Sequence, residues 1–189
     1  MHIKQYNEFN SENVIETKNI ANPGDWIIRA KTENGEQYVI RPDKFPKLYD
    51  INSNRKPSDK QISDLGFEEY KTIPDSRTAL VCDRETLDII KSKISDDITS
   101  QTKMLEIVKS LKDRFIFCKK RENVYARKAT KVEEIITIVK GGKEEEVIFE
   151  PSWGGTMPIC EDDVLIVTNN SVYRVAIYEF EQTYIILNK

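Results

Sequence analysis

Short apolar runs bounded by turn residues lie near the two ends of the chain, and this pattern predicts antiparallel strands there. Residues 26–30 and 37–40 form two such runs around Asn34-Gly35. An Asn-Gly pair favours a type I′ turn, because glycine adopts positive φ without a steric penalty. The pattern therefore predicts a β-hairpin, followed at residues 43–49 by a short helical turn or an extended segment.

From Asp83 onward the apolar residues recur every three or four positions, which is the period of an amphipathic helix. Asp83 itself is predicted to cap the N-terminus of this helix. Whether residues 84–115 form one helix or two stays open, because Ser95-Asp96-Asp97 can either separate two helices or lie within one. The apolar positions of this predicted helical stripe are Leu87, Ile90, Ile94, Ile98, Met104, Leu105, Val108, Leu111 and Phe115.

β-Branched and aromatic residues dominate the chain after the helices and predict a series of strands. Gly141-Gly142 and residues 168–171 are predicted turns, and residues 151–156 are a predicted loop. The predicted strands are residues 115–120, 124–129, 132–139, 144–150, 164–167 and 172–180.

The hairpin near the N-terminus can be aligned with a second hairpin near the C-terminus. Each has an Asp before its first strand and a Tyr in its second strand, followed by a Phe and another Tyr. The Tyr-to-Phe spacing is seven positions and the Phe-to-Tyr spacing is four in both copies, so only the turn differs in length. A length change confined to a turn leaves the strand register intact. The matched pairs are Asp25 and Asp163, Tyr38 and Tyr173, Phe45 and Phe180, and Tyr49 and Tyr184.

Pro23-Gly24 is predicted to form a tight turn that leads into the first strand. The Asp25 carboxylate is expected to accept a hydrogen bond within that turn, which is a structural and not a catalytic role. Asp162-Asp163 is predicted to do the same in the second copy without a glycine.

These patterns predict an α+β protein in which two related β-hairpin units form a β-rich core or small barrel, with one or two central helices packed on it. The N-terminal hairpin unit occupies residues 1–50, a linker residues 51–82, a helical segment residues 83–115, and the C-terminal β-rich unit residues 116–189. Together they are predicted to form one compact domain.

Composition narrows the classes of protein that fit. Of 189 residues, 39% are apolar and 32% are charged, and the net charge is -3, which is unlike the strongly positive domains that bind nucleic acid. No apolar run reaches the roughly 18 residues that a membrane span needs, and residues 1–14 lack the apolar region of a secretory signal. We therefore expect a cytoplasmic protein, or one in the host cytosol if it is a phage protein or effector, with no membrane contact.

The reactive side chains argue against several enzyme mechanisms. The one histidine, His2, stands at the start of the chain, so an internal imidazole base for a catalytic triad is missing. Cys82, Cys118 and Cys160 are odd in number and widely spaced, which predicts reduced thiols and not a disulfide framework. With no Cys-x-x-Cys and no His pair, we expect no metal and no cofactor.

The segment Trp153-Gly154-Gly155-Thr156 is the strongest candidate site in the sequence. Two glycines allow close approach of a ligand to the backbone, successive N–H groups can bind an anion, and tryptophan can stack on a ring. The structural alternative is a turn whose tryptophan fills the end of a small barrel.

Cationic side chains in the first hairpin give a second candidate. Arg29 and Arg41, near Trp26 and Tyr38, can hold a phosphate or carboxylate if they share one face. The alternative is a solvated sheet edge whose charges prevent pairing with other chains. The full predicted ligand-binding set is Trp26, Arg29, Tyr38, Arg41, Trp153, Gly154, Gly155, Thr156 and Tyr173.

Basic and aromatic residues also alternate around residues 114–128, a pattern found in proteins that bind single-stranded nucleic acid. Acidic runs at residues 144–146 and 161–163 oppose that function. We therefore do not expect nucleic acid as a partner.

Several of these segments resemble the PGDYG family of small bacterial and phage proteins. The resemblance lies in the PGDW of residues 23–26 and in residues 125–139, 151–157, 161–167 and 172–184. The Trp-Gly-Gly and Phe-x-x-Thr-Tyr elements are kept, whereas Trp-Ile replaces the Tyr-Gly of the family motif. The resemblance implies a fold and a phage or bacterial origin, but no activity.

The sequence therefore favours a non-catalytic binding protein that engages a partner protein or a small anionic metabolite between the two repeat units. One alternative is a metal-independent enzyme acting on a nucleotide-like or ADP-ribose-like substrate. Another is a phage or bacterial effector that docks through its helical face, which requires an exposed apolar patch on residues 87–111.

Overall fold

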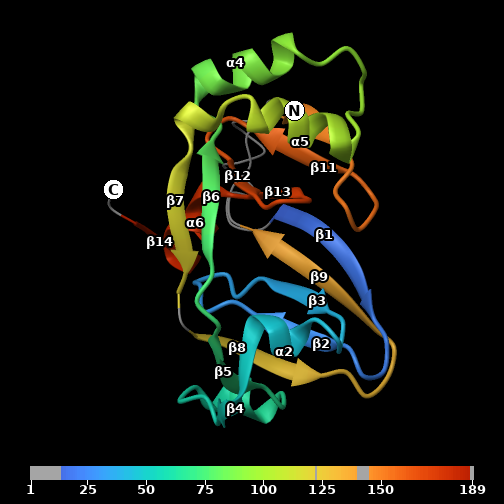
Figure 1. Ribbon diagram of the computed structural model, residues 1–189. Coiled ribbons are helices and arrows are strands. Elements are labelled where there is room, and N and C mark those ends of the chain that lie inside the picture. The colour runs from blue at the N-terminus through green and yellow to red at the C-terminus, as the bar shows by residue number, and fades with distance from the viewer. Residues whose placement is uncertain (1–13, 122, 140–144, 188–189) are drawn as a thin grey trace. The chain divides into compact units, whose positions relative to one another are not determined.

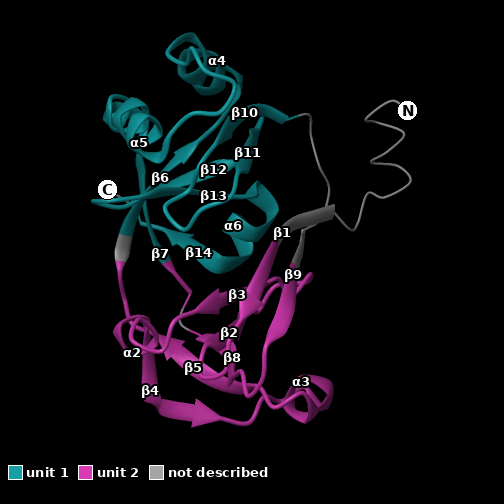
Figure 2. Ribbon diagram, turned by 90° about the vertical axis from the view of Figure 1, so that its right-hand side faces the viewer, with its two compact units in different colours: residues 1–9, 76–119, 142–189 teal, residues 10–75, 120–141 magenta. Residues whose placement is uncertain are grey.

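The computed structural model describes residues 14–121, 123–139 and 145–187, and its chain divides into two compact units (Figure 2). Unit 1 comprises residues 1–9, 76–119 and 142–189, and unit 2 comprises residues 10–75 and 120–141. Each unit has its own sheet and its own buried core, which is why the chain divides into two units where the sequence predicted one compact domain.

Unit 2 is built on a five-stranded antiparallel sheet with the order β3-β2-β8-β5-β4 (Figure 1). A separate two-stranded ribbon pairs β1 with β9, and two short helices complete the unit. The elements are β1 (Val14–Ala21), β2 (Trp26–Arg29), β3 (Gln37–Ile40), α2 (Phe45–Leu48), β4 (Tyr49–Arg55), α3 (Lys60–Asp64), β5 (Glu68–Thr72), β8 (Asn123–Lys128) and β9 (Glu133–Val139).

Aromatic rings form the core on one face of the unit 2 sheet. Phe45 of α2 stacks on Trp26, with ring centroids 3.8 Å apart. Tyr70 of β5 meets both of these rings edge-on. The opposite face packs Ile27, Phe67, Ala129 and Ile135 into a second cluster. Side chains alternate between the two faces along each strand, so one sheet supports both clusters.

Unit 1 contains a second five-stranded sheet, with the order β13-β12-β6-β7-β14. A two-stranded pair, β10 and β11, packs with two helices on one face, and α6 covers the other. The elements are β6 (Ser76–Val81), α4 (Arg84–Ser92), α5 (Gln101–Lys109), the 3-10 helix η1 (Lys112–Arg114), β7 (Ile116–Lys120), β10 (Glu145–Phe149), β11 (Met157–Cys160), β12 (Val164–Val167), β13 (Val172–Val175), α6 (Ile177–Thr183) and β14 (Tyr184–Ile186).

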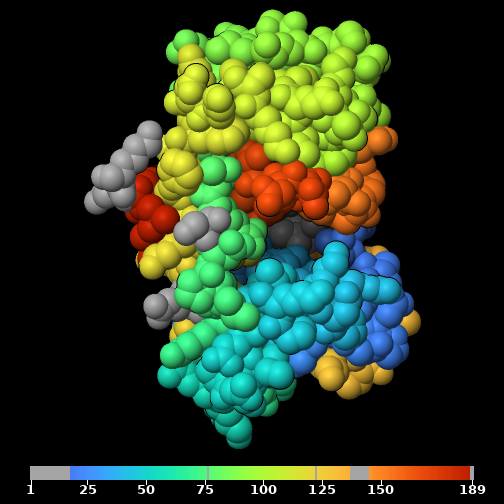
Figure 3. All heavy atoms as spheres, viewed as in Figure 1, coloured from blue at the N-terminus to red at the C-terminus, as the bar shows by residue number. Residues whose placement is uncertain are grey.

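The helical segment forms two helices, which settles the question that the sequence left open. Asp83 caps α4 by accepting a hydrogen bond from the Thr86 N–H at 2.8 Å, as predicted. Ser100 caps α5 by accepting from the Lys103 N–H at 3.2 Å. Figure 3 shows the outer surface of these helices. Their apolar residues face inward: Leu87, Ile90, Met104, Ile107 and Val108 are all buried against the sheet and against β10 and β11.

The β-hairpin at residues 26–40 is present, but its turn differs from the prediction. Gly35 has a φ of 56°, whereas Asn34 is not among the residues with positive φ. A type I′ turn requires positive φ at both central positions. The Gly35 N–H donates to the Thr32 carbonyl at 3.2 Å, so the glycine stands at the last position of a longer turn.

Residues 51–82 are not a linker. They contain most of β4, and all of α3, β5 and β6. Their polar sequence hides these elements because β4 is an edge strand, exposed along much of its length. The short helix α3 is stabilised locally, since the Asp59 carboxylate accepts from the Gln61 N–H at 2.8 Å.

The predicted strand at residues 172–180 is also wrong in its second half. β13 ends at Val175, and the chain continues as α6. Phe180 on that helix is buried and stacks on Tyr184, with centroids 5.0 Å apart. Burial of this ring in the core outweighs the β-propensity of Tyr and Phe. The described strands form open antiparallel sheets, so the α+β class is confirmed and a closed barrel is not observed among them.

Four other predicted strands are present, and two predicted features lie outside the described residues. The strands expected at residues 115–120, 124–129, 132–139 and 164–167 are confirmed to within one residue or two at each end. The predicted turn at Gly141-Gly142 and the position of His2 lie outside the described residues.

Candidate functional site

The turns before β2 and β12 have the same hydrogen bonds. The Asp25 carboxylate accepts from the Asn22 N–H at 2.9 Å, and the Asp163 carboxylate accepts from the Cys160 N–H at 2.8 Å. In both turns the preceding residue has positive φ: 94° for Gly24 and 66° for Asp162. The structural role predicted for Asp25 is therefore confirmed.

Each Asp also forms an ion pair. Arg41 lies 3.3 Å from Asp25 in unit 2, and Arg174 lies 3.6 Å from Asp163 in unit 1. The two pairs differ in exposure, because the Arg41 side chain is 63% exposed and that of Arg174 only 7%. The ion pair of unit 1 is therefore the more strongly desolvated of the two.

A hydrogen bond between two tyrosines recurs in the same way. The hydroxyls of Tyr38 and Tyr49 are 2.8 Å apart in unit 2, and those of Tyr173 and Tyr184 are 3.1 Å apart in unit 1. Burial raises the pKa of Tyr184 well above its usual value, so this phenol stays protonated. Both pairs tie the second strand of the hairpin to the strand that follows the helix.

The structure does not bring Arg29 and Arg41 to one ligand. The guanidinium of Arg29 lies against Gly35, in the hairpin turn. That of Arg41 lies at Asp25, beside the Pro-Gly turn. Gly35 and Asp25 stand at opposite ends of the hairpin, because β2 and β3 separate them. Both arginines thus have structural contacts within unit 2.

Trp26 and Tyr38 are partly buried residues of the unit 2 core. Lysine side chains cover their remaining ring surface: Lys128 lies over Trp26 and Lys120 over Tyr38, each with its ammonium 5.3 Å from the ring centre. These cation–π contacts occupy ring faces that a ligand would need. Two cations of the predicted basic run are thereby placed in contacts within unit 2.

The Trp153 loop in unit 1 has a different character. Trp153 is 56% exposed, so it does not fill the end of a barrel. Gly154 and Gly155 have φ values of 92° and 79°, which side chains rarely adopt, and the Gly154 N–H closes a turn onto the Pro151 carbonyl at 3.0 Å. Thr156, also exposed, completes the loop.

Tyr173 supports this exposed tryptophan. The two rings are tilted at 58° with centroids 6.2 Å apart. The Tyr173 hydroxyl accepts a hydrogen bond from Arg77 of β6 and is also bonded to Tyr184. Two hydrogen bonds therefore orient the Tyr173 ring, and this ring packs against one side of the Trp153 ring. This group of Trp153, Tyr173 and Arg77 is called the Trp153 cluster below.

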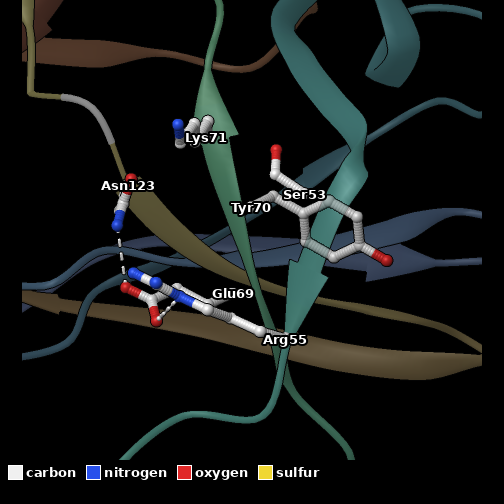
Figure 4. A pocket seen from close by; sticks show the side chains of 6 residues that line it. All are labelled: Ser53, Arg55, Glu69, Tyr70, Lys71 and Asn123. Atoms are coloured by element: carbon white, nitrogen blue, oxygen red, sulfur yellow. Dashed lines mark hydrogen bonds and ion pairs between the residues drawn. The ribbon is translucent and has the colours of Figure 1, made fainter.

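A cavity of about 60 Å³ that is lined by residues with polar or charged side chains lies in unit 2 (Figure 4). At its base the Glu69 carboxylate accepts hydrogen bonds from Lys31 at 2.6 Å, from Arg55 at 2.8 Å and from Asn123 at 2.9 Å. Figure 4 shows Arg55 reaching across from β4 to this carboxylate, while the Tyr70 ring points to the other side. The cavity is lined by Ser53, Arg55, Glu69, Tyr70, Lys71 and Asn123.

These donors set the ionisation of Glu69. The hydrogen bond from Arg55, reinforced by Lys31 and Asn123, lowers the pKa of Glu69 to about 2 against the opposing effect of burial. The carboxylate is therefore ionised at neutral pH. The sequence did not identify this site, because it predicts a linker over most of β4 and all of β5. The residues that line the cavity also lie on three separate strands.

A second group of charges lies on the surface of unit 1. Arg84 at the start of α4 binds both Glu146 and Glu161, the latter at 2.6 Å. Lys91 lies 3.1 Å from Glu146. The bond from Arg84 is the main cause that lowers the pKa of Glu146 to about 2. These contacts attach α4 to β10 and to the turn after β11, and they use part of the acidic residues noted in the sequence.

The three cysteines are free thiols and all are buried. Burial raises the pKa of Cys118 to about 11 and that of Cys82 further, so neither is a thiolate at neutral pH. Within residues 14–121, 123–139 and 145–187, no cluster of three or more His, Cys, Asp or Glu is placed to hold a metal ion. No helix in the same ranges is long and apolar enough to cross a membrane.

Comparison of the chain with protein-family models, with curated proteins and with solved structures finds no match in any of the three.

Proposed function

We propose that this chain is a non-catalytic binding protein built from two related β units, and that unit 1 binds a partner protein through the Trp153 cluster. The relation between the units is supported by the five-stranded sheet that each contains and by the shared hydrogen bonds of Asp25 and Asp163. The matching tyrosine pairs support it further. On this proposal both units correspond to the PGDYG-type unit that the sequence resembles, and the protein comes from a phage or a bacterium.

The binding proposal rests on one observation: the large aromatic side chain of Trp153 is exposed to solvent and packs against Tyr173. Trp153 is 56% exposed, on a turn defined by two glycines with positive φ. The Tyr173 ring packs against it, and the Tyr173 hydroxyl accepts a hydrogen bond from Arg77. Trp, Tyr and Arg are the residue types most enriched among those that dominate the energy of protein interfaces. A rigid anchor of this kind loses little conformational entropy on binding.

The other hypotheses receive less support from the geometry. Docking through the helical face needs an exposed apolar stripe, but Leu87, Ile90 and Val108 are buried in the unit 1 core. For an enzyme, a general acid or base works best with a pKa near neutrality. Glu69 and Glu146 instead have pKa values of about 2 and are held ionised by arginine, which suits structural ion pairs.

The proposal predicts that Trp153→Ala abolishes partner capture without unfolding the protein. Wild type and variant are immobilised in parallel, and the proteins that each retains from a lysate of the source cell are compared by quantitative mass spectrometry. A retained protein is then purified and its affinity measured by calorimetry. We expect Trp153→Ala to weaken binding by about 30-fold, since loss of an interface anchor costs roughly 2 kcal/mol.

Ile98→Ala is the matched control, because Ile98 is another exposed apolar residue of unit 1, at 47%. It should leave the affinity unchanged. Equal affinity of the purified partner for wild type and Trp153→Ala would contradict the proposal, as would equal loss with both variants.

A further inference from the structure

The strand pair β4–β5 in unit 2 is interrupted by a bulge. Between the paired positions Asp50↔Lys71 and Arg55↔Glu69, β4 advances five residues while β5 advances two. The extra residues of β4 are pushed out of the ladder. Bulges of this kind redirect side chains and are frequent beside functional sites.

The bulge is held in one conformation by its own hydrogen bonds. The Asn52 N–H donates to the Asp50 carboxylate at 2.9 Å, and the Ser53 hydroxyl donates to the Asp50 carbonyl at 3.2 Å. Asn54 donates to Glu68 on β5 at 2.7 Å. These hydrogen bonds stabilise the bulge, so the gap between β4 and β5 is a defined part of the structure of unit 2.

The cavity described above lies at this interruption, with lining residues from both sides of the bulge. Its volume of about 60 Å³ compares with the roughly 10–15 Å³ that one water molecule needs on the same measure. The space is large enough for one tetrahedral oxyanion group and too small for a whole nucleotide.

The charges around the cavity favour an anion. Two cations, Lys31 and Arg55, bind the single carboxylate of Glu69, and Lys71 adds a third positive charge. Lys71 is exposed, and its ammonium makes no hydrogen bond or ion pair with another described residue. Even with Glu69 ionised, these four groups sum to a positive charge.

The hydrogen bond to Glu69 uses the Nε of Arg55 and leaves its two terminal nitrogens available to a ligand. These two nitrogens make no hydrogen bond with the described part of the chain. The Arg55 side chain is 64% exposed. A carboxylate that fixes one edge of a guanidinium reduces the entropy lost when the other edge binds a ligand. Glu69 is thus a positioning residue for Arg55.

We propose that this bulge cavity is a binding site for a phosphate group, held by the terminal nitrogens of Arg55 and the ammonium of Lys71. A guanidinium donates two parallel hydrogen bonds to phosphate oxygens, and a lysine adds a point charge. The site lies in unit 2 and takes a small ligand, so it is independent of the partner surface proposed for unit 1. The ligand is either free phosphate or a phosphate monoester whose organic part stays outside the cavity.

The test is a titration of the ¹⁵N-labelled full chain, followed by NMR, with inorganic phosphate at constant ionic strength. We expect saturable shifts at the backbone amides of residues 53–55 and 69–71 and at the side-chain N–H groups of Arg55 and Asn123. A parallel titration with a simple alkyl phosphate separates the two sources of the group. Tighter binding of the monoester identifies an organic phosphate as the ligand, and weaker binding identifies free phosphate.

Variants show whether the named residues hold the anion. Lys71→Gln and Arg55→Gln should each weaken phosphate binding about tenfold, the usual size of a lost charge-assisted hydrogen bond. Lys56→Gln is the matched control, an exposed lysine close in sequence that does not line the cavity, and it should change the affinity less than about twofold.

Absence of saturable shifts at these residues would overturn the proposal. So would an affinity that falls equally in Lys71→Gln and Lys56→Gln, because it would indicate unspecific screening of charge. Because the Lys71 ammonium makes no hydrogen bond or ion pair with the described residues, the comparison of Lys71→Gln with Lys56→Gln tests the proposal even if Arg55→Gln is unstable.

Discussion

At the scale of single residues, three buried or half-buried carboxylates of this protein are stabilised by cations placed around them. Glu69 receives three donors, Glu146 receives Arg84 and Lys91, and Glu133 is paired with Arg127 at 2.5 Å. Each of these contacts lowers the pKa of its carboxyl group. Such carboxylates make the folded state sensitive to acid, because the unfolded chain binds protons at a higher pH.

The Glu69→Gln variant should show this for one group. The pKa of Glu69 is about 2 in the folded protein and about 4.3 in an unfolded chain. The stabilisation from its ionisation is therefore complete above pH ~4.3 and disappears as the pH falls toward ~2. We expect the free energy of unfolding of wild type, measured by urea denaturation, to fall more steeply between pH 5 and pH 2 than that of Glu69→Gln.

Glu106→Gln provides the control, because Glu106 is exposed on α5 and lies outside the Glu69 contacts. If Glu69→Gln and Glu106→Gln gave the same pH dependence, the hydrogen bonds to Glu69 would contribute nothing to stability.

At the scale of elements, side-chain caps decide where the central helices begin. Asp83 and Ser100 both have extended backbone, and each accepts a hydrogen bond from an N–H in the first turn of its helix. The hydrogen bond from Thr86 also lowers the pKa of Asp83. Because each cap uses residues within one turn, it can be recognised in the sequence, as Asp83 was.

Replacing this cap should destabilise α4 in a predictable order. Asp83→Ala removes the acceptor and should cost about 1 kcal/mol in the free energy of unfolding, whereas Asp83→Asn keeps an acceptor and should cost less. Thermal or urea unfolding measures the difference. Asp97→Ala, an exposed residue between the helices, is the control. A cost for Asp83→Asn equal to that of Asp83→Ala would exclude capping as the cause.

At the scale of the whole molecule, each unit has a five-stranded sheet, but the two sheets differ in the order of their strands along the chain and in what is added to them. Unit 1 has α4, α5 and the exposed Trp153, and unit 2 has the β1–β9 ribbon and the cavity. The shared Asp turn is also used differently: its ion pair is buried in unit 1, while its arginine is solvent-exposed in unit 2.

This difference predicts unequal effects of the same substitution in the two units. Asp163→Ala leaves the buried Arg174 guanidinium with one carboxylate fewer, and breaking a buried ion pair typically costs roughly 3–5 kcal/mol. Asp25→Ala leaves Arg41, which can return to water, so a cost nearer 1 kcal/mol is expected for the lost turn hydrogen bond. Urea unfolding of both variants measures the costs, and a larger cost for Asp25→Ala would show that burial does not govern these pairs.

Much of the fold follows from local sequence. The strands of the first hairpin, the cap of α4 and the hydrogen bond of Asp25 involve residues at most a few positions apart. Periodicity, turn residues and capping preferences act over the same short range, which is why they could be predicted. The aligned spacing likewise identified two tyrosines in each unit, and these form a hydrogen bond with one another in both units.

What the sequence alone determined is therefore part of the local elements, such as the strands of the first hairpin and the start of α4, and the structural role of Asp25. Only the tertiary structure decided that residues 177–183 form a helix, that residues 51–82 belong to a sheet, and that Arg55, Glu69 and Asn123 meet. These outcomes depend on contacts between strands that are distant in sequence. Burial of Phe180 and pairing of charges across β4, β5 and β8 provide free energy that no short segment of the chain contains by itself.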